Sequence, residues 1–391
     1  MKRRLSALAV ITALTALLSG CYPAGQAPAP IGESESEQTG DSNPVLPFPD
    51  NIILEMDLPK NTPSEVPSVI LTLKKWDKEE IKNLFFDGKV ITYENEIDEK
   101  HMPGEKFNCW DTEDEMVAMR PGRIHYDNKA VLGGEFRYGT VYHYGTNDCT
   151  VIDDSYASDE ELSAFSHADA KKLAQEMIDK LGITNLGEPR IISVHANLAN
   201  KILEQFKGWK ENAGETFEYT PWTENEEIYV LRYPQVFENT ELAMNNINYT
   251  TSPSRIGTVT EMPGVIAVVN KDKILSFQAT GIFSEKYELG EKFSVKYNSN
   301  QALEKFREYL SNCVWDSTIK YYSCKLVYIP YTGTDDNLTV SFKPAWEFAG
   351  FEKRDKSDAE YYSELDLTLH GAQFYEYFYA DTGHRYVPES N

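Results

Sequence analysis

The sequence has few basic residues for its length. Among 391 residues, 38 are lysine or arginine and 62 are aspartate or glutamate, which gives a formal net charge of -24 at pH 7. A surface of this sign repels phosphate backbones, and no stretch of the chain gathers basic residues into a patch that would reverse the effect. Nucleic acid is therefore not expected as a partner.

The signatures of common catalytic sites are also missing. The chain contains no Gly-x-Ser-x-Gly elbow, no glycine-rich phosphate loop, no His-Glu-x-x-His and no Cys-x-x-Cys. Three histidines, His101, His125 and His143, could hold zinc together with Glu135, but their irregular spacing favours ordinary surface histidines. No catalytic residue, metal or cofactor is predicted, and the sequence does not indicate an enzyme.

Long hydrophobic runs are absent after the first 20 residues, since no later segment approaches the 18 apolar residues of a membrane-spanning helix. The chain begins with the basic Lys2-Arg3-Arg4, continues with an apolar run from Leu5 to Leu18, and then has Ser19 and Gly20 directly before Cys21. An apolar run this short, with these flanks, is typical of a secretory signal.

These residues resemble the lipobox of bacterial lipoproteins. The resemblance implies that residues 1–20 are a signal peptide and that Cys21 becomes the acylated N-terminus of the mature chain; an ordinary signal peptide with an incidental cysteine is the alternative. Each buried methylene contributes about 0.8 kcal/mol and one acyl chain holds only marginally, so the two chains of a diacylated Cys21 are needed to anchor the protein. The expected location is the extracytoplasmic face of the cell membrane.

Cysteine is scarce, with five in the chain. Apart from Cys21 these are Cys109, Cys149, Cys313 and Cys324. An even number of thiols usually pairs in an exported protein, and proximity in sequence favours Cys109 with Cys149 and Cys313 with Cys324. Four free buried thiols are the alternative, because some bacteria that export lipoproteins oxidise thiols poorly.

Composition and periodicity divide the rest of the chain. Residues 21–50 are rich in proline, alanine, glycine, serine and glutamate and form a flexible tether. Three segments follow, an N-terminal domain at 51–155, a middle domain at 156–284 and a C-terminal domain at 285–391. We expect an α+β protein of two or three domains, each a mostly antiparallel sheet with packed helices.

The last hundred residues repeat the order of the segment before them. An apolar helical stripe at 302–310 is followed by strands at 321–328, 338–348 and 373–379 and by the turn Asp381-Thr382-Gly383. A similar order of helix, strands and hairpin runs from about residue 166 to residue 277. This repetition predicts a tandem duplication, with chance coincidence of a coarse order as the alternative.

The C-terminal part resembles PepSY-type modules. Such modules occur in membrane-anchored regulators of cell-wall sensor kinases, where a Pro-x-Trp, here Pro344-Ala345-Trp346, precedes the final strand. The earlier copy has neither this tryptophan nor the Asp-x-Gly. The resemblance implies an envelope protein or the ectodomain of a sensor kinase as partner. The whole chain is also similar to uncharacterised lipoproteins of Gram-positive gut bacteria, which implies no activity.

An aromatic run at 374–379 contains the candidate ligand-binding residues. In a strand, Tyr375, Tyr377 and Tyr379 share one face and Phe374 and Phe378 the other. A row of tyrosines can stack on a sugar or contact a partner protein, because each ring has an apolar face and a polar tip. Cross-strand packing is the simpler interpretation of the tyrosines, and core packing is that of Trp346, a further candidate.

The sequence thus predicts a lipid-anchored extracytoplasmic binding or regulatory protein without an evident catalytic site. The alternative is a cell-envelope hydrolase or a carbohydrate-binding lipoprotein, whose acid and base residues sequence spacing cannot single out.

The lipobox resemblance predicts the N-terminus of the native protein. Mass spectrometry should find a mature chain that begins at Cys21 and carries fatty acid on it. A chain that begins at Met1 and carries no lipid would contradict the prediction.

Overall fold

The computed structural model describes residues 47–99, 102, 104–129, 160–212, 214, 216, 218–243, 247–250, 258–261, 263–313, 318–333, 338–353 and 373–386. All of them belong to one unit, Leu46–Asn391. The expected signal peptide, Cys21 and most of the expected tether lie outside the described residues. Within the described residues, no helix is long and apolar enough to cross a membrane.

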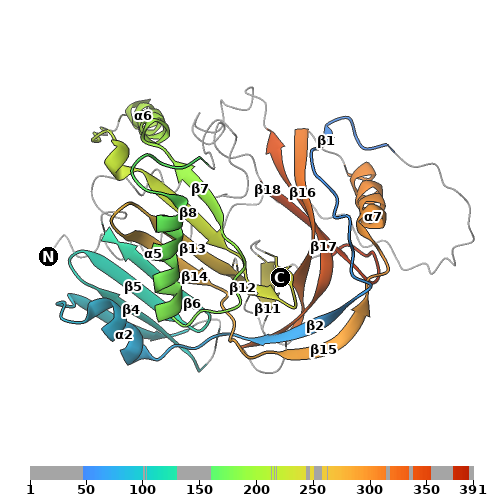
Figure 1. The fold of residues 1–391 in the computed structure, drawn as a ribbon, viewed down its shortest axis with the longest axis horizontal. Coiled ribbons are helices and arrows are strands. Elements are labelled where there is room, and N and C mark those ends of the chain that lie inside the picture. Colours follow the sequence, from blue (N-terminus) through green and yellow to red (C-terminus); the bar gives the residue numbers. More distant parts are fainter. Residues whose placement is uncertain are drawn as a thin grey trace, which may run out of the picture. The chain divides into compact units, whose positions relative to one another are not determined.

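Eight antiparallel strands form sheet one, in the order β3-β4-β5-β6-β14-β13-β8-β7 (Figure 1). The strands are β3 (Tyr93–Asp98), β4 (Lys106–Asp111), β5 (Glu115–Arg120), β6 (Arg123–Asn128), β7 (Arg190–Val194), β8 (Ile228–Tyr233), β13 (Gly264–Val269) and β14 (Ile274–Thr280).

Sheet two has the order β15-β2-β17-β16-β10-β9, with β1 also paired to β16 and β18 to β17. Its strands are β1 (Ile52–Leu54), β2 (Glu65–Thr72), β9 (Val236–Phe237), β10 (Thr240–Leu242), β15 (Glu288–Ser294), β16 (Thr318–Gly333), β17 (Thr339–Lys353) and β18 (Gln373–Tyr379). Strands β1 and β10 run parallel to β16, and the other pairs are antiparallel. A separate antiparallel pair consists of β11 (Ile247–Thr250) and β12 (Thr258–Glu261).

The expectation of mostly antiparallel sheet is confirmed. Helices are fewer than an α+β fold with packed helices requires. The described α-helices are α2 (Lys78–Phe86), α5 (His167–Lys180), α6 (Ala196–Asn212) and α7 (Ser299–Ser311), with a short 3₁₀ turn η1 (Glu224–Glu226). The fold is therefore mostly β, with two large sheets.

The first and the middle expected segments each contribute strands to both sheets, and the strands of the last segment all lie in sheet two. Sheet one joins β6 of the first segment to β14 of the middle segment, and sheet two joins β2 of the first segment to β15 and β17 of the last. Both cases pair segments well over a hundred residues apart, and such pairing leaves no local mark in the sequence. The boundaries at 155 and 284 thus do not separate independent sheets.

Local sequence signals account for the helices. Asp77 caps α2, its Oδ1 accepting the backbone N–H of Glu79 and Glu80 at 2.9 and 3.0 Å, as its position before an apolar stripe predicts. Ser166 opens α5 in a capping box with Asp169, and Gly182, at φ 58°, follows its end. The helix expected from about residue 166 is thus confirmed.

Helices pack on both faces of sheet one. Helix α5 buries Ala170, Ala174 and Ile178 against residues of β8, β13 and β14 on one face. Helix α6 packs Ala199 and Leu203 in a separate cluster with residues of β7, β8 and β13. Sheet one is therefore buried on both sides at its β7–β14 end.

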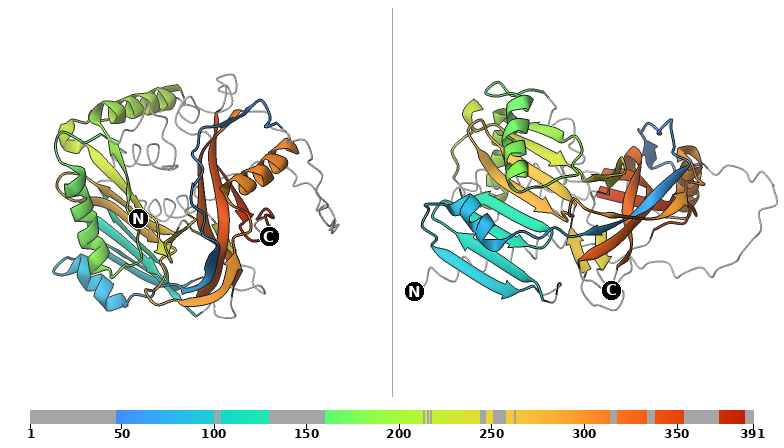
Figure 2. Two further views of the ribbon diagram at one scale, coloured as in Figure 1. Left: turned by 45° about the vertical axis from the view of Figure 1, so that its right-hand side comes forward. Right: turned by 60° about the horizontal axis from the view of Figure 1, so that its bottom comes forward.

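Helix α7 packs on one face of sheet two, beside β16, β17 and β18 (Figure 2). Phe306 is fully buried, with its ring centroid 4.3 Å from that of Phe348 and 4.7 Å from that of Tyr321. The first of these ring pairs is stacked and the second is edge-on, which are the arrangements that aromatic quadrupoles favour.

The two helix-and-sheet segments share an order of strands. Helix α5 is followed by β7, then by α6 and β8, and after β9 to β12 by β13 and β14; β7, β8, β13 and β14 are neighbours in sheet one in that order. Helix α7 is followed by β16, β17 and β18, also consecutive neighbours, and by a bridge between Phe378 and Arg385.

An ion pair between Arg385 and the buried carboxylate of Glu376 holds the end of the described chain. Arg385 Nε donates to Glu376 Oε2 at 2.6 Å, and its guanidinium carbon lies 4.3 Å from the ring centroid of Tyr309 on α7. Burial raises the pKa of Glu376, and Arg385 opposes that shift. The pair therefore links the turn after β18 to both the strand and the helix.

We expect Arg385→Met to destabilise the protein by about 3 kcal/mol at pH 7, because it leaves a buried carboxylate without its partner. The loss should shrink as the pH falls towards 5, since the pKa of Glu376 rises further without Arg385 and protonation removes the buried charge. Urea unfolding at both pH values measures it. Lys305→Met, which breaks an exposed pair with Glu308 on α7, should change stability by less than about 0.5 kcal/mol. Equal losses at the two pH values would contradict the prediction.

Candidate functional site

Strand β18 places the three predicted tyrosines on one face of sheet two. Tyr377 lies opposite Glu347 of β17, and Tyr379 lies opposite Ala345. Tyr377 is buried, whereas Tyr375 and Tyr379 are half-buried. We call this side of β16, β17 and β18 the tyrosine face.

Trp346 lies on the other face. It is 1% exposed, pairs across strands with Phe378 in the cluster beneath α7, and donates its Nε1–H to the backbone oxygen of Tyr297 at 2.7 Å. The ring is therefore buried in the core, and its N–H has a hydrogen-bond acceptor there. The structure therefore separates Trp346 from the tyrosines and places it in packing, not in a ligand platform.

A buried lysine that the sequence did not point to occupies the tyrosine face. Lys343 is 7% exposed, and its Nζ lies 3.5 Å from the ring centroid of Tyr379, 4.4 Å from that of Tyr331 and 5.6 Å from that of Phe293. We call these three rings the aromatic cage. Such contacts stabilise a cation by about 0.5–2 kcal/mol, more when water is excluded.

Burial lowers the pKa of Lys343, and the negative charges of Asp381 and Glu291 only partly oppose the shift. The aromatic rings therefore offset only part of the free energy that is lost when this lysine is desolvated. Ionisable groups whose pKa is shifted by desolvation are common at sites that bind a ligand or a partner.

The backbone explains why Lys343 reaches this position. One edge of β17 pairs with β16 throughout, with Lys343 opposite Ile329. Its other edge pairs with β2 as far as Phe342 and with β18 from Ala345 onwards. Lys343 and Pro344 lie where one partner strand gives way to the other. A proline is tolerated there because its missing N–H has no strand to pair with on that edge.

A chain of polar contacts continues along the tyrosine face. Tyr377 donates its hydroxyl to Oε2 of the buried Glu347 at 3.0 Å. Lys325 Nζ lies 3.7 Å from Glu347 Oε1 and 2.6 Å from Oε2 of the half-exposed Glu241. Burial opposes the charge of Lys325, but the two carboxylates together raise its pKa. Glu347 thus has a hydrogen-bond donor and a cation beside it.

The aromatic rings continue from the cage onto the surface. Tyr386 packs edge-on against Tyr379 and Tyr377, with centroids 5.9 and 6.3 Å apart, and Phe293 packs against Tyr331 at 6.1 Å. Tyr331 is 45% exposed and the other rings are partly covered, Tyr377 most of all. We call the four rings of Phe293, Tyr331, Tyr379 and Tyr386 the aromatic patch.

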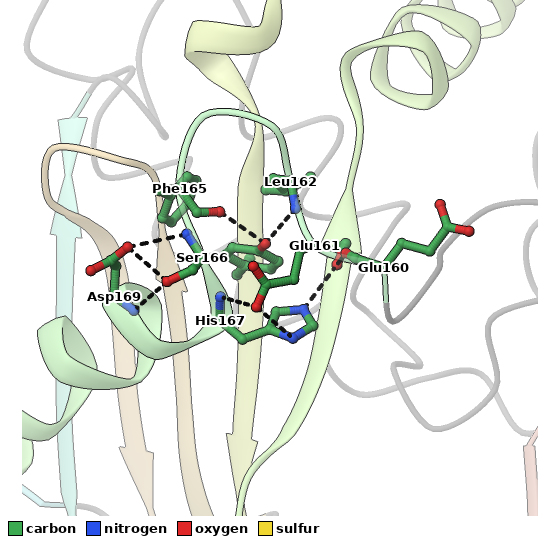
Figure 3. A network of polar contacts seen from close by, with 9 residues as sticks. Glu160, Glu161, Leu162, Phe165, Ser166, His167 and Asp169 are labelled. Carbon is green, nitrogen blue, oxygen red and sulfur yellow. Dashed lines mark hydrogen bonds and ion pairs between the residues drawn. The ribbon is translucent and has the colours of Figure 1, made fainter.

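A second polar cluster, before helix α5, has the residue types of a catalytic triad (Figure 3). His167 Nε2 lies 3.5 Å from Ser193 Oγ, and His167 Nδ1 lies 3.8 Å from Glu161 Oε1. Ser193, however, is completely buried, and its hydroxyl donates to the backbone oxygen of Glu160. A hydroxyl that no substrate can reach and that is already committed as a donor does not act as a nucleophile.

The same cluster has a clear structural role. The hydroxyl of Tyr229 accepts the backbone N–H of Leu162 at 2.5 Å and donates to the backbone oxygen of Phe165 at 3.1 Å (Figure 3). Together with the capping box of Ser166, these bonds hold the segment that leads into α5 against β7 and β8.

The described cysteines are free thiols. Cys109 lies on β4 and is buried, Cys324 is buried on β16, and Cys313 follows α7 with its Sγ directed at the backbone oxygen of Tyr309, 3.4 Å away. The expected bond between Cys313 and Cys324 is not formed in this structure, and Cys149 lies outside the described residues. Burial raises the pKa of Cys109 and of Cys324 to about 12, which keeps both thiols protonated and unreactive at neutral pH.

The described residues contain no group of three or more potential metal ligands. His125 lies on β6 with its Nε2 2.6 Å from Oδ2 of Asp127. His101, His143 and Glu135 fall outside the described part of the chain.

The comparisons with known proteins bear on the fold. No family model and no curated protein matches the chain. Among solved structures, it is similar to the crystal structure of an uncharacterized protein from Eubacterium rectale ATCC 33656, with a TM-score of 0.57, 13% sequence identity, and coverage of 87% of this chain and 91% of that chain. At this level of identity the likeness concerns the fold alone.

Two lysines of the tyrosine face should respond in opposite ways to the loss of charge. Lys343→Met keeps the apolar stem and removes a desolvated charge, so stability at pH 7 should stay the same or rise by up to about 1 kcal/mol. Lys325→Met leaves Glu347 buried without a cation and should cost about 3 kcal/mol. Urea unfolding measures both.

The difference in stability between the wild type and Lys343→Met should also depend on pH. Because its folded pKa lies below the unfolded value, wild-type stability rises as the pH passes from the folded to the unfolded pKa. Any advantage of Lys343→Met should therefore fade as the pH approaches 10. A loss above about 2 kcal/mol for Lys343→Met at pH 7 would mean that the aromatic cage makes this lysine a net stabiliser.

Proposed function

We propose that this protein is a lipid-anchored binding or regulatory protein on the extracytoplasmic face of the cell membrane, and that the aromatic patch around Lys343 is its contact surface for a protein of the envelope. The observation that carries the proposal is the burial of Lys343 beside the rings of Tyr379 and the exposed Tyr331. The lipobox-like residues before Cys21 support the anchor.

The composition of the patch supports a protein partner. Tyrosine and phenylalanine are enriched in the cores of protein interfaces, where a large ring is buried with little loss of conformational entropy. Tyr331 has ring area to bury, and the ammonium group of Lys343 lies 4.4 Å from the centroid of that ring. A carboxylate of the partner could pair with Lys343 without a further desolvation penalty for the lysine, because Lys343 is already desolvated in the folded protein.

A regulatory role is supported by the order of elements. We propose that the α5 and α7 segments are a tandem pair of PepSY-like modules, because each contains a helix followed by strands that pair as antiparallel neighbours, with α6 and β9 to β12 inserted in the α5 segment. The PepSY resemblance makes a sensor-kinase ectodomain one candidate for the envelope partner.

Site-specific crosslinking in intact cells tests the contact. With p-benzoylphenylalanine in place of Tyr331, irradiation should give a discrete adduct with one envelope protein. The matched control carries the same photoprobe at Tyr93, which is 39% exposed on β3 of sheet one, and should give no such adduct. Lys343→Met in the Tyr331 probe strain should reduce the adduct about tenfold, because it removes the cation from the contact.

The anchor is tested separately in the same strains. Cys21→Ser should release the protein from the membrane fraction. An adduct that forms equally from Tyr93 and Tyr331, or that is unchanged by Lys343→Met, would overturn the contact. Adducts with glycan in place of protein would favour a carbohydrate-binding lipoprotein over the proposed protein partner.

A further inference from the structure

A hollow beside helix α5 lies outside the site described above. Its volume is about 530 Å³, and its lining includes Lys171, Lys172, Gln175, Asn185, Glu188 and Tyr233. Cavities of this size accommodate small organic ligands. The walls come from α5 and from the loop that joins it to β7, and the buried Ile178 and Ile183 provide apolar lining between them.

The loop wall is held rigidly in an unfavourable backbone conformation. Asn185 has φ 56°, in the left-handed region, and its backbone oxygen accepts the N–H of Val236 at 2.7 Å. The N–H of Gly187 donates to the backbone oxygen of Pro234 at 2.9 Å. These bonds fix the loop to the segment after β8, so the position of Asn185 is set by the fold and does not depend on a ligand.

The side-chain amide of Asn185 has a donor to spare. Its Nδ2 is buried and has no hydrogen-bond partner among the described residues. Buried amides are almost always paired, and strained residues with unpaired polar groups gather at binding sites. Because Asn185 lines the hollow, a ligand oxygen there would satisfy the amide.

The charged groups of the lining favour an anion. Lys171 Nζ lies 3.0 Å from Glu188 Oε2, but these side chains are 44% and 90% exposed, so the pair is weak and easily exchanged. Lys172 is exposed on the next position of α5. A ligand carboxylate can therefore replace Glu188 beside Lys171, and Lys172 lines the same hollow.

Tyr233 adds a phenol group to the lining. Tyr233 is 4% exposed, and burial raises its pKa to about 12, so its hydroxyl stays protonated at neutral pH. The lining thus offers ammonium, amide and hydroxyl donors with a single carboxylate. We infer that the hollow between α5 and the Asn185 loop binds a small carboxylate that also carries hydrogen-bond acceptors, and that this site is independent of the aromatic patch.

Calorimetric titration of the purified ectodomain with a panel of lactate, succinate, citrate and glucuronate tests the inference, with glucose as the uncharged counterpart of glucuronate. At least one carboxylate should bind with a Kd below about 1 mM, an affinity that a few charge-assisted hydrogen bonds provide. Glucose should bind at least about tenfold more weakly than glucuronate if glucuronate is the carboxylate bound.

Variants distinguish binding in this hollow from nonspecific attraction of anions to surface lysines. Asn185→Gly removes the amide while glycine retains the left-handed backbone, and Lys172→Met removes one cation; each should weaken binding about tenfold. Lys180→Met is the matched control, because Lys180 is exposed on the same helix and is not part of the lining, and it should leave the Kd unchanged. If Asn185→Gly unfolds, Asn185→Asp preserves the shape and should weaken binding further, since it opposes an anion with an anion.

Two results would overturn the inference. One is the absence of binding by every member of the panel. The other is binding that Asn185→Gly and Lys172→Met leave unchanged, or that Lys180→Met weakens equally.

Discussion

The exchange of partners along β17 is the constraint on which the rest of sheet two depends. One edge of this long strand pairs with β16, while the other passes from β2, near the start of the described chain, to β18, near its end. The exchange falls at Lys343 and Pro344. It brings together segments that are more than 300 residues apart, and it places a lysine where the rings of β15, β16 and β18 converge.

Sheet two has two kinds of buried charge, carboxylates beside a cation and a lysine beside aromatic rings. Under α7, Glu376 is compensated by Arg385, and on the tyrosine face Glu347 is compensated by Lys325. Each pair crosses between elements, so each carboxylate contributes to holding the fold together. Among the described residues, Lys343 has aromatic rings around it and forms no ion pair with a carboxylate. Such a buried cation is unexpected from the acidic composition of the chain, and it is the feature that directs attention to the aromatic patch.

Polar clusters with similar residue types differ in what they can do. The cluster of Ser193, His167 and Glu161 has the residue types of hydrolytic chemistry. Ser193, however, is fully buried, and its hydroxyl donates to the backbone of the segment that covers it. Asn185 has a common residue type and no motif, yet its unpaired amide lines a hollow. Accessibility and unmet hydrogen bonds separate the two cases, and both depend on neighbours that are distant in sequence.

The sequence by itself determined the helix from about residue 166, the helical stripe at 302–310 and the strands of the last segment from residue 321 onwards, because caps, apolar stripes and alternation act over a few residues. It missed β15, a charged strand with Gly290 in its middle, and it gave no sign of Lys343, since a lysine in a strand looks the same whether rings or water surround it. The lipobox resemblance also comes from sequence alone. Only the tertiary structure decided which strands share a sheet, that Trp346 faces α7 and the tyrosines face away from it, and which polar groups are left unpaired. Those outcomes follow from pairing between segments far apart in the chain, which no local pattern records.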